Sequence, residues 1–207
     1  RRRHTRYWRD WSSDVCSSDL EFDKTLKPFL MDMYEEFYNS NMPPVILAEG
    51  AQSFNLDIDW GDYPYVTSSG CTVAAAVANG VPPKKIRNIW GVTKAYETYV
   101  GLKKFQPEDP IFDQIREKGM EYGATTGRPR QCNWINVAGL VKAIEINGAN
   151  KIVINKADIL NEIGAWKAYD SDGYLVEFRT ENEMKQWVAS KLPSDIEVHW
   201  SYSPESI

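Results

Sequence analysis

Apolar residues along the chain recur with the spacing of helices in several segments. Between Phe22 and Phe37 they follow the three-to-four-residue period of an amphipathic helix, predicted over about 24–39. Residues 71–80, with the letters CTVAAAVANG, have the small side chains and final glycine of a helix and its C-cap. Further helices are predicted over 82–90, 110–119, 134–147 and 180–191.

Short apolar runs between these segments predict strands. Residues 45–48 (VILA) and 151–155 (KIVIN) have the composition of buried strands. Asp172-Gly173 predicts a hairpin turn between two of the later strands. Those further strands are predicted over 91–100, 165–170, 173–178 and 195–201. Helices alternating with apolar strands indicate an α/β fold with a mainly parallel sheet and flanking helices.

Composition narrows the class of protein. The 207 residues are 43% hydrophobic and 26% charged, which is typical of a soluble globular domain. A net charge of −5 argues against nucleic acid as a partner, and no apolar run is long enough to cross a membrane. Three cysteines form neither a metal-ligand spacing nor a disulfide framework, so we expect a cytoplasmic setting.

The first twenty residues look foreign to the protein. Residues 10–20 (DWSSDVCSSDL) match the translation of a common short-read sequencing adapter, and 2–6 fit the upstream part of the same oligonucleotide. A natural basic arm that binds RNA or phosphate would be the alternative. We therefore expect an artefactual leader over 1–20 and one domain over 21–207, whose N-terminal part is missing. No repeat or clear linker divides that domain.

Three loops carry residue types suited to ligands. The first runs from EGAQ at 49–52 through DIDWGDYPYVTSS at 57–69. Gln52 has a donor and an acceptor and could read a base edge, and the hydroxyls of 67–69 precede a helix, where phosphate binds well. A plain helix cap and a solvated acidic turn would explain the same residues.

The second loop is GATTGRPR at 123–130, in which two glycines bracket two hydroxyls and two arginines follow. Arginine grips carboxylate or phosphate with two parallel hydrogen bonds, although a solvated surface turn is the alternative.

The third loop is NKAD at 155–158, directly after the KIVIN strand. A carboxylate there could accept hydrogen bonds from N1–H and the 2-amino group of guanine, which adenine lacks. Alone, Asp158 could equally cap a helix.

Together these sequence motifs resemble those of the adenylosuccinate synthetase family. The order EGAQ, DIDWGDYPYVTSS, KAYETYVG, YGATTGRPR, NKAD is that family's order, and the resemblance covers about residues 44–201. It implies a P-loop-NTPase-like synthetase fold and a ligase that forms a C–N bond in AMP biosynthesis. GTP would phosphorylate the 6-oxygen of IMP, and the amine of L-aspartate would displace the phosphate. Mg²⁺ as cofactor and a homodimer are also implied.

The resemblance also assigns residues. Gln52 would hold the 6-oxo edge of IMP, Thr67 its 5′-phosphate, and Val100 and Gly101 its ribose. Thr125, Thr126 and Arg128 would bind the aspartate carboxylates, and Arg130 would bridge aspartate and nucleotide. GTP would be bound by Lys156, Asp158, Ser201, Ser203 and Pro204.

The sequence departs from the family pattern at several points. The departures are Ser53, Gly70, Tyr99, Pro129, Ala157, Tyr202 and a short 169–201 region. Tyr99 puts the ribose contacts in question. The family's phosphate loop, catalytic Asp and His and the Mg²⁺ ligands would lie upstream of Glu21, so no catalytic residue is identifiable and His199 is expected to be structural. We therefore expect this chain alone to be inactive.

Two other functions fit part of the sequence. A viral 2-aminoadenylosuccinate synthetase acting on dGMP is compatible with Gly70-Cys71 and the short C-terminal region. A non-catalytic guanine-nucleotide-binding module would explain 155–158 alone, but it gives no reason for 123–130. A chain lacking upstream strands could also fail to fold alone because its sheet would expose apolar edges.

Overall fold

The computed structural model describes residues 28, 32, 34–39, 41–42 and 45–205. Contacts divide the chain into two compact units, 1–48 and 49–207. In the first unit, a π-helical turn, η3, spans Glu35–Asn39. The leader at 1–20 and most of the helix predicted over 24–39 lie outside the described residues.

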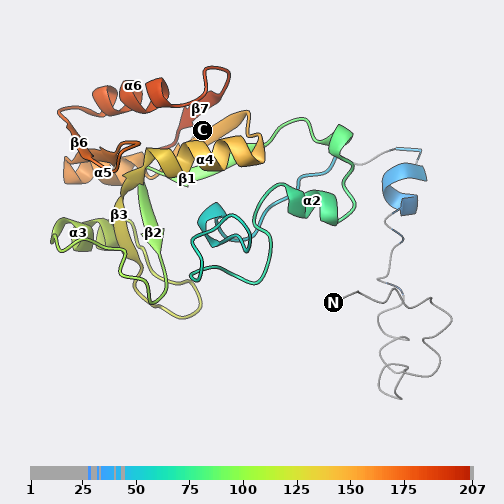
Figure 1. The fold of residues 1–207 in the computed structure, drawn as a ribbon, viewed down its shortest axis with the longest axis horizontal. Helices are drawn as coiled ribbons and strands as arrows, with labels where there is room; N and C mark the ends of the chain where they lie inside the picture. The colour runs from blue at the N-terminus through green and yellow to red at the C-terminus, as the bar shows by residue number, and fades with distance from the viewer. Residues whose placement is uncertain (1–27, 29–31, 33, 40, 43–44, 206–207) are drawn as a thin grey trace, which may run out of the picture. The chain divides into compact units, whose positions relative to one another are not determined.

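A three-stranded parallel sheet organises the second unit (Figure 1). Its order is β1 (Trp90–Lys94), β4 (Lys151–Asn155) and β7 (Glu197–Trp200). β1 and β7 both pair with β4 in parallel, so the carboxyl ends of the three strands lie at the same edge of the sheet. The strands predicted over 151–155 and 195–201 are confirmed, and His199 lies in β7, as expected.

A second sheet is mixed. Its order is β2 (Tyr96–Tyr99), β3 (Gln131–Asn136), β5 (Trp166–Tyr169) and β6 (Leu175–Phe178). Only β3 and β5 are parallel, while β2–β3 and β5–β6 are antiparallel. The predicted hairpin at Asp172-Gly173 is confirmed, with Gly173 at a φ of 81°. The α/β class holds, but the expected single, mainly parallel sheet is two sheets.

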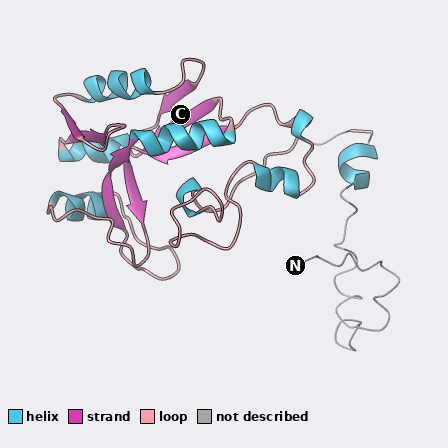
Figure 2. Ribbon diagram, in the orientation of Figure 1, coloured by secondary structure: helices cyan, strands magenta, loops and turns pink. Residues whose placement is uncertain are grey.

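Helices flank these sheets (Figure 2). The helices of the second unit are α2 (Ala74–Ala78), α3 (Ile111–Lys118), α4 (Val137–Asn147), α5 (Ala157–Ile163) and α6 (Glu181–Lys191), with 3-10 turns η4 (Phe54–Leu56) and η5 (Pro83–Lys85). Of these, α6 packs on β5 and β6, α4 on β5, and α3 on β3. The helices predicted over 110–119 and 180–191 are confirmed, and that over 71–80 is a shorter α2.

Three sequence predictions fail at element boundaries because tertiary pairing overrides local pattern. The helix predicted over 82–90 is only the turn η5, since the Asn150 side chain and backbone hold Ile89 in line with β4. The strand over 91–100 breaks at the buried Ala95 into two strands of different sheets. The helix over 134–147 starts only after Asn136, whose side chain caps α4.

The apolar run at 45–48 is not a buried strand. It has no regular structure, and Val45 and Leu47 are 102% and 92% exposed. A short apolar run forms a strand only when a neighbouring strand accepts its backbone hydrogen bonds, and none of the described strands does so.

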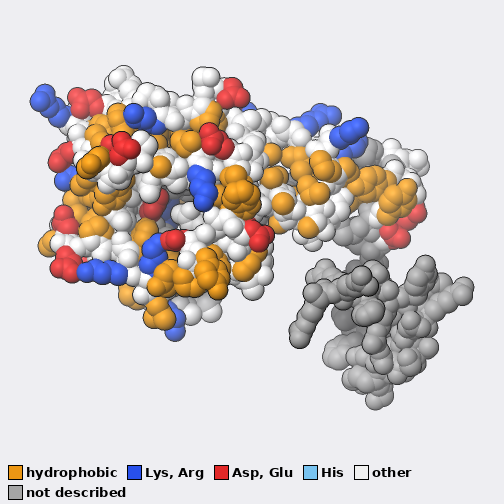
Figure 3. Space-filling view, viewed as in Figure 1, with side chains coloured by type: hydrophobic (Ala, Val, Ile, Leu, Met, Phe, Trp, Pro, Cys, Tyr) orange, Lys and Arg blue, Asp and Glu red, His pale blue; other side chains and the backbone are white. Residues whose placement is uncertain are grey.

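Apolar side chains of both sheets and four helices form one core in the second unit. The fully buried members include Phe112, Ile135, Ile154 and Leu160. Outside the core, hydrophobic side chains gather on the surface over α2 (Figure 3). No helix within the described part of the chain is long and apolar enough to cross a membrane.

Candidate functional site

The carboxyl edge of the parallel sheet brings two candidate segments together. After β4, residues 155–158 turn into α5, and the N–H of Ala157 donates to the Ser201 carbonyl at 3.4 Å. Ser201, just after β7, donates its own N–H to the Ile154 carbonyl at 2.9 Å. Ligands of open α/β sheets bind at such an edge. The candidate GTP residues gathered here are Lys156, Asp158, Ser201, Ser203 and Pro204.

The two charged residues of this edge have different surroundings. Lys156 has a left-handed backbone, with φ of 62°, and its Nζ donates to the Gly119 carbonyl at 3.0 Å. Asp158 lies half-buried in the first turn of α5, and no hydrogen bond or ion pair joins its carboxylate to the rest of 45–205. The buried Oδ1 of Asn155 also lacks a hydrogen-bond partner there. The Asp158 carboxylate is therefore a partly exposed acceptor at this edge, whereas the Asn155 Oδ1 is enclosed.

The arginine loop, residues 123–130, is a tight turn that leads into β3. Gly123 donates its N–H to the Arg128 carbonyl at 2.9 Å, and Gly127 donates to Gly123 at 2.8 Å. Gly127 has a φ of 62°, which favours glycine. The Arg128 guanidinium makes no hydrogen bond or ion pair with the described residues. The exposed candidate residues of the loop are Thr125, Thr126 and Arg128.

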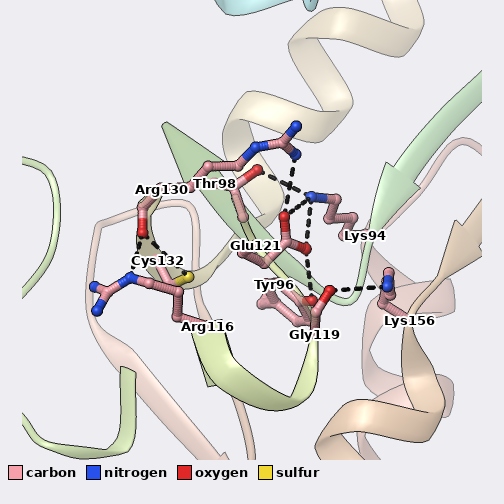
Figure 4. A network of polar contacts seen from close by, with 9 residues as sticks. All are labelled: Lys94, Tyr96, Thr98, Arg116, Gly119, Glu121, Arg130, Cys132 and Lys156. Atoms are coloured by element: carbon pink, nitrogen blue, oxygen red, sulfur yellow. Dashed lines mark hydrogen bonds and ion pairs between the residues drawn. The ribbon is translucent and has the colours of Figure 1, made fainter. Parts of the chain in front are cut away.

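A buried carboxylate, Glu121, ties this loop to both sheets (Figure 4). Lys94 Nζ donates to both Glu121 oxygens at 2.7 Å, and the Tyr96 hydroxyl donates to Oε1 at 2.7 Å. Arg130 Nη1 donates to Oε2 at 3.1 Å. Lys94 ends β1, Tyr96 begins β2, and Arg130 precedes β3. Glu121 was not among the residues predicted from the sequence, although a carboxylate beside an arginine-rich loop could have indicated an ion pair.

Electrostatics in this cluster favour the ionised carboxylate. Burial alone would raise the pKa of Glu121, but the hydrogen bonds from Lys94 and Tyr96 and the charges of Lys94 and Arg130 outweigh burial and lower the pKa. Burial, then Glu121, raises the pKa of Tyr96, so its hydroxyl stays a donor. One negative charge thus faces two positive charges, which leaves the cluster with a surplus positive charge.

The candidate ribose residues lie at the base of the arginine loop. Val100 and Gly101 follow β2, and Tyr99 pairs with Gln131 across the β2–β3 ladder. The Gln131 Nε2 donates to the Gly101 carbonyl at 3.3 Å. A side chain at position 101 would meet the Tyr99 hydroxyl, so the Tyr99 ring would have to shift to admit it. Tyr99 packs against Phe105, with ring centroids 5.7 Å apart.

The loop over residues 49–71 is folded around Asp57, which is 2% exposed. Its Oδ1 accepts the backbone N–H groups of Asp59 and Trp60, each at 2.9 Å, and its Oδ2 accepts that of Cys71 at 2.6 Å. Burial would raise the pKa of Asp57, but these backbone hydrogen bonds lower it. The alternative of a solvated acidic turn therefore does not hold at Asp57, which is buried and shapes the loop.

Gln52 and Thr67 belong to this loop. Gln52 is exposed, has a φ of 66°, and accepts a weak hydrogen bond from Cys71 Sγ at 3.5 Å. Thr67 is half-buried and donates its N–H to the Leu56 carbonyl at 2.8 Å. Within residues 45–205, no hydrogen bond or ion pair joins either residue to the arginine loop. The ion pair of Asp62 with Lys103 does tie this loop to the stretch that follows Gly101.

Left-handed backbone at residues other than glycine falls at the candidate loops. In the described part of the chain it occurs at Gln52, Met120 and Lys156. Such residues cost about 1–3 kcal/mol each and concentrate at functional sites. Met120 links Gly119, which accepts from Lys156, to Glu121, which holds Arg130. No three metal-ligating side chains cluster among the described residues.

Comparisons with known proteins identify the relatives of this chain. A family model for adenylosuccinate synthetase matches residues 6–194, beginning inside the segment that we expect to be foreign. Adenylosuccinate synthetase of Helicobacter pylori (strain HPAG1) is 40% identical over 175 residues, 81% of this chain and 43% of that protein. That of Clostridium botulinum (strain Eklund 17B / Type B) is 39% identical over 173 residues, 80% of this chain and 40% of that protein. This chain thus spans about two fifths of the length of these relatives.

Solved structures agree with these relatives. Fully ligated adenylosuccinate synthetase from Plasmodium falciparum has a TM-score of 0.65 and 31% identity, covering 88% of this chain and 45% of that one. The succinoaminodeoxyadenylate synthetase of cyanophage S-2L, bound to dGMP and dATP, has a TM-score of 0.51 and 21% identity, which shows a shared fold. It covers 73% of this chain and 41% of that one. The resemblance read from the motifs is confirmed: the chain belongs to the adenylosuccinate synthetase family.

Proposed function

We propose that this chain is the C-terminal substrate-binding part of an enzyme that joins L-aspartate to IMP with GTP. In that reaction GTP transfers a phosphoryl group to the 6-oxygen of IMP, giving GDP. The aspartate amine then attacks C6 and releases phosphate, leaving adenylosuccinate. The residues of this chain would bind and orient the three substrates.

One observation carries the proposal, namely the linkage of two ligand-type loops at one sheet edge. Lys156 donates to Gly119, and two residues later Glu121 holds Arg130. The guanine motif and the arginine loop are therefore joined by hydrogen bonds through the short segment 119–121. A lone guanine-binding module would have no need of this connection.

The guanine base would lie against Asp158. Its carboxylate makes no hydrogen bond or ion pair with the other described residues, so it can accept hydrogen bonds from N1–H and the 2-amino group. Adenine would leave the half-buried carboxylate without those donors, at a cost that favours GTP. Residues 201–204 would close over the base from the neighbouring strand.

Aspartate would bind at the arginine loop. The Arg128 guanidinium is exposed and, among residues 45–205, makes no hydrogen bond or ion pair, so it can take a carboxylate with two hydrogen bonds. Thr125 and Thr126 would donate their hydroxyls to the carboxylates. Arg130, whose Nη1 is held by Glu121, would bridge towards IMP with its remaining donors.

IMP would span two regions. Gln52 would read its 6-oxo edge and Thr67 would contact the 5′-phosphate, while Val100 and Gly101 would lie along the ribose. The family resemblance leads us to expect the Mg²⁺ ligands in the N-terminal part of the enzyme, upstream of Glu21. A homodimer stays a prediction.

Calorimetric titration of the 207-residue chain with GDP and ADP tests the proposal. We expect clear preference for GDP in the wild type. Asp158→Asn presents a donor where guanine also presents donors, so it should lose about 1–3 kcal/mol of GDP affinity and none of its ADP affinity. The exposed Asp195→Asn is the matched control and should leave both affinities unchanged.

Equal affinity of the wild type for GDP and ADP would contradict the guanine site. An unchanged preference in Asp158→Asn would mean that Asp158 is only a residue of the first helical turn. Circular dichroism of both variants separates these outcomes from misfolding.

A second candidate acceptor is dGMP, which is bound in the cyanophage S-2L synthetase of the same fold. Titration with IMP and dGMP discriminates the two, since a tighter dGMP complex would assign the chain to the viral type of reaction.

A further inference from the structure

Glu121 is too completely enclosed to contact a ligand directly. Only 2% of the residue is exposed, and its oxygens already accept from Lys94, Tyr96 and Arg130. Any effect of Glu121 on substrate must therefore pass through one of these partners. Arg130 is the partner that lies on the arginine loop.

Hydrogen bonds hold Arg130 at its backbone N–H, its guanidinium and its backbone carbonyl. Its backbone N–H donates to the Glu121 carbonyl at 2.9 Å, and its Nη1 donates to Glu121 Oε2 at 3.1 Å. Its backbone carbonyl accepts from Arg116 Nε at 2.7 Å. About a third of the Arg130 side chain, 34%, remains exposed. The guanidinium is thus held by one edge while another part stays accessible.

Charge adds a reason for a carboxylate at this position. Lys94 and Arg130 both point at Glu121, and without it their positive charges would repel each other. Burial, together with the charge of Arg130, lowers the pKa of Lys94, while Glu121 raises it. A glutamine at 121 would turn an N–H₂ group towards two donors. Arg130 would then have to swing away from Lys94, although the loop backbone could remain folded.

We propose that Glu121 is a positioning residue, which orients Arg130 for the carboxylate of L-aspartate and keeps it apart from Lys94. This rests on the proposed function, in which Arg130 contacts aspartate. Glu121 itself touches no substrate, and its influence on aspartate binding requires Arg130.

A double-mutant cycle tests this dependence. The dissociation constant of L-aspartate is measured by NMR titration of the 207-residue chain in the presence of IMP and GDP. We expect Glu121→Gln and Arg130→Met each to raise it about tenfold, which is ~1.4 kcal/mol. Glu121→Gln should add little in the Arg130→Met background, because the residue through which it acts is already absent.

Tyr96→Phe is the matched control within the same cluster. It removes one hydrogen bond to Glu121 Oε1 but keeps the carboxylate charge and the Arg130 contact on Oε2. It should change the aspartate dissociation constant by less than about twofold, although it destabilises the fold. Glu121→Asp, which keeps the charge, should recover part of the affinity lost in Glu121→Gln.

A second readout needs no substrate. In ¹⁵N-arginine-labelled chain, the Arg130 guanidinium signals should report restricted rotation in the wild type and in Tyr96→Phe, and free rotation in Glu121→Gln. Free rotation in the wild type would overturn the proposal, as would equal losses of aspartate affinity from Glu121→Gln with and without Arg130.

The failure of the proposed function would look different. If the wild type binds no L-aspartate in the presence of both nucleotides, the aspartate site falls, and the positioning role falls with it. If the wild type binds aspartate and Glu121→Gln binds it equally well, only the positioning role is refuted.

Discussion

Two buried carboxylates organise two regions of this molecule in different ways. Asp57 and Glu121 are each 2% exposed. Asp57 is surrounded by backbone N–H groups from residues at most 14 positions away. Glu121 is surrounded by side chains, among them Lys94, which lies 27 positions away at the end of β1. Backbone donors shape one loop, whereas side-chain donors join separate elements into one cluster.

The comparison shows where a substitution should act. Any residue except proline can supply the backbone N–H groups that donate to Asp57. The loop over residues 49–71 therefore depends on one side chain, that of Asp57. The Glu121 cluster depends on several residue identities at once, and removing one leaves charges of the others uncompensated. A buried ion pair that loses one partner is destabilised more than a loop that loses one cap.

The largest expected effect is that of Glu121→Ala on stability. It leaves Lys94 and Arg130 facing each other without a carboxylate, and should lower the free energy of unfolding by about 4 kcal/mol. Urea unfolding followed by tryptophan fluorescence measures this. Glu117→Ala, at an exposed position of α3, should change it by less than about 0.5 kcal/mol. A loss as small as that of the control would show that the cluster adds nothing to stability.

Asp57→Ala should have a smaller and more local effect. Three backbone N–H groups lose their acceptor, but they lie near the surface where water can replace it, so we expect a loss of about 2 kcal/mol. Hydrogen exchange should accelerate at Asp59, Trp60 and Cys71 and stay slow in β3. Exposed Asp59→Ala serves as the control. Acceleration throughout β3 would contradict the separation of the two regions.

The smallest effect concerns pH. Both carboxyls have a lowered pKa in the folded chain. The stability that they contribute is therefore fully present above their unfolded pKa values, about 4, and is lost as pH falls through the folded values. The urea midpoint should decrease as the pH falls below roughly 4.5. In Glu121→Gln this decrease should be smaller, by about 1 kcal/mol of unfolding free energy. Other carboxyls such as Glu181 also have a lowered pKa, so the difference between variants is the measure. Parallel curves would mean that Glu121 titrates alike in both states.

The local sequence pattern was sufficient wherever an element's own residues determine its structure. KIVIN at 151–155 is a strand because its three central residues are buried on both faces of a covered sheet. The Asp172-Gly173 hairpin follows from turn chemistry alone. The arginine loop and residues 155–158 were recognised from short sequence motifs. The backbone freedom of glycine and the hydrogen-bonding groups of arginine and aspartate can be read from residue type alone.

Pattern failed where a distant partner decides. The apolar run at 45–48 could not be told from a strand without knowing what lies beside it. Residues 91–100 are strand-like throughout. The tertiary structure shows where the first sheet ends, because the Ala95 N–H donates to the carbonyl of Asn155, the last residue of β4. Gln52 and Thr67 were placed by resemblance, and their meeting with the other substrate residues remains a prediction.

The sequence by itself determined the family, the α/β class and the identity of the ligand-type loops, because these depend on side-chain chemistry and short-range spacing. Only the tertiary structure decided that Glu121 is buried, that Lys94 and Arg130 converge on it, and that Lys156 reaches the same segment. Burial and long-range pairing come from how the two sheets pack, and the free energy of a charge depends on the partners which that packing supplies.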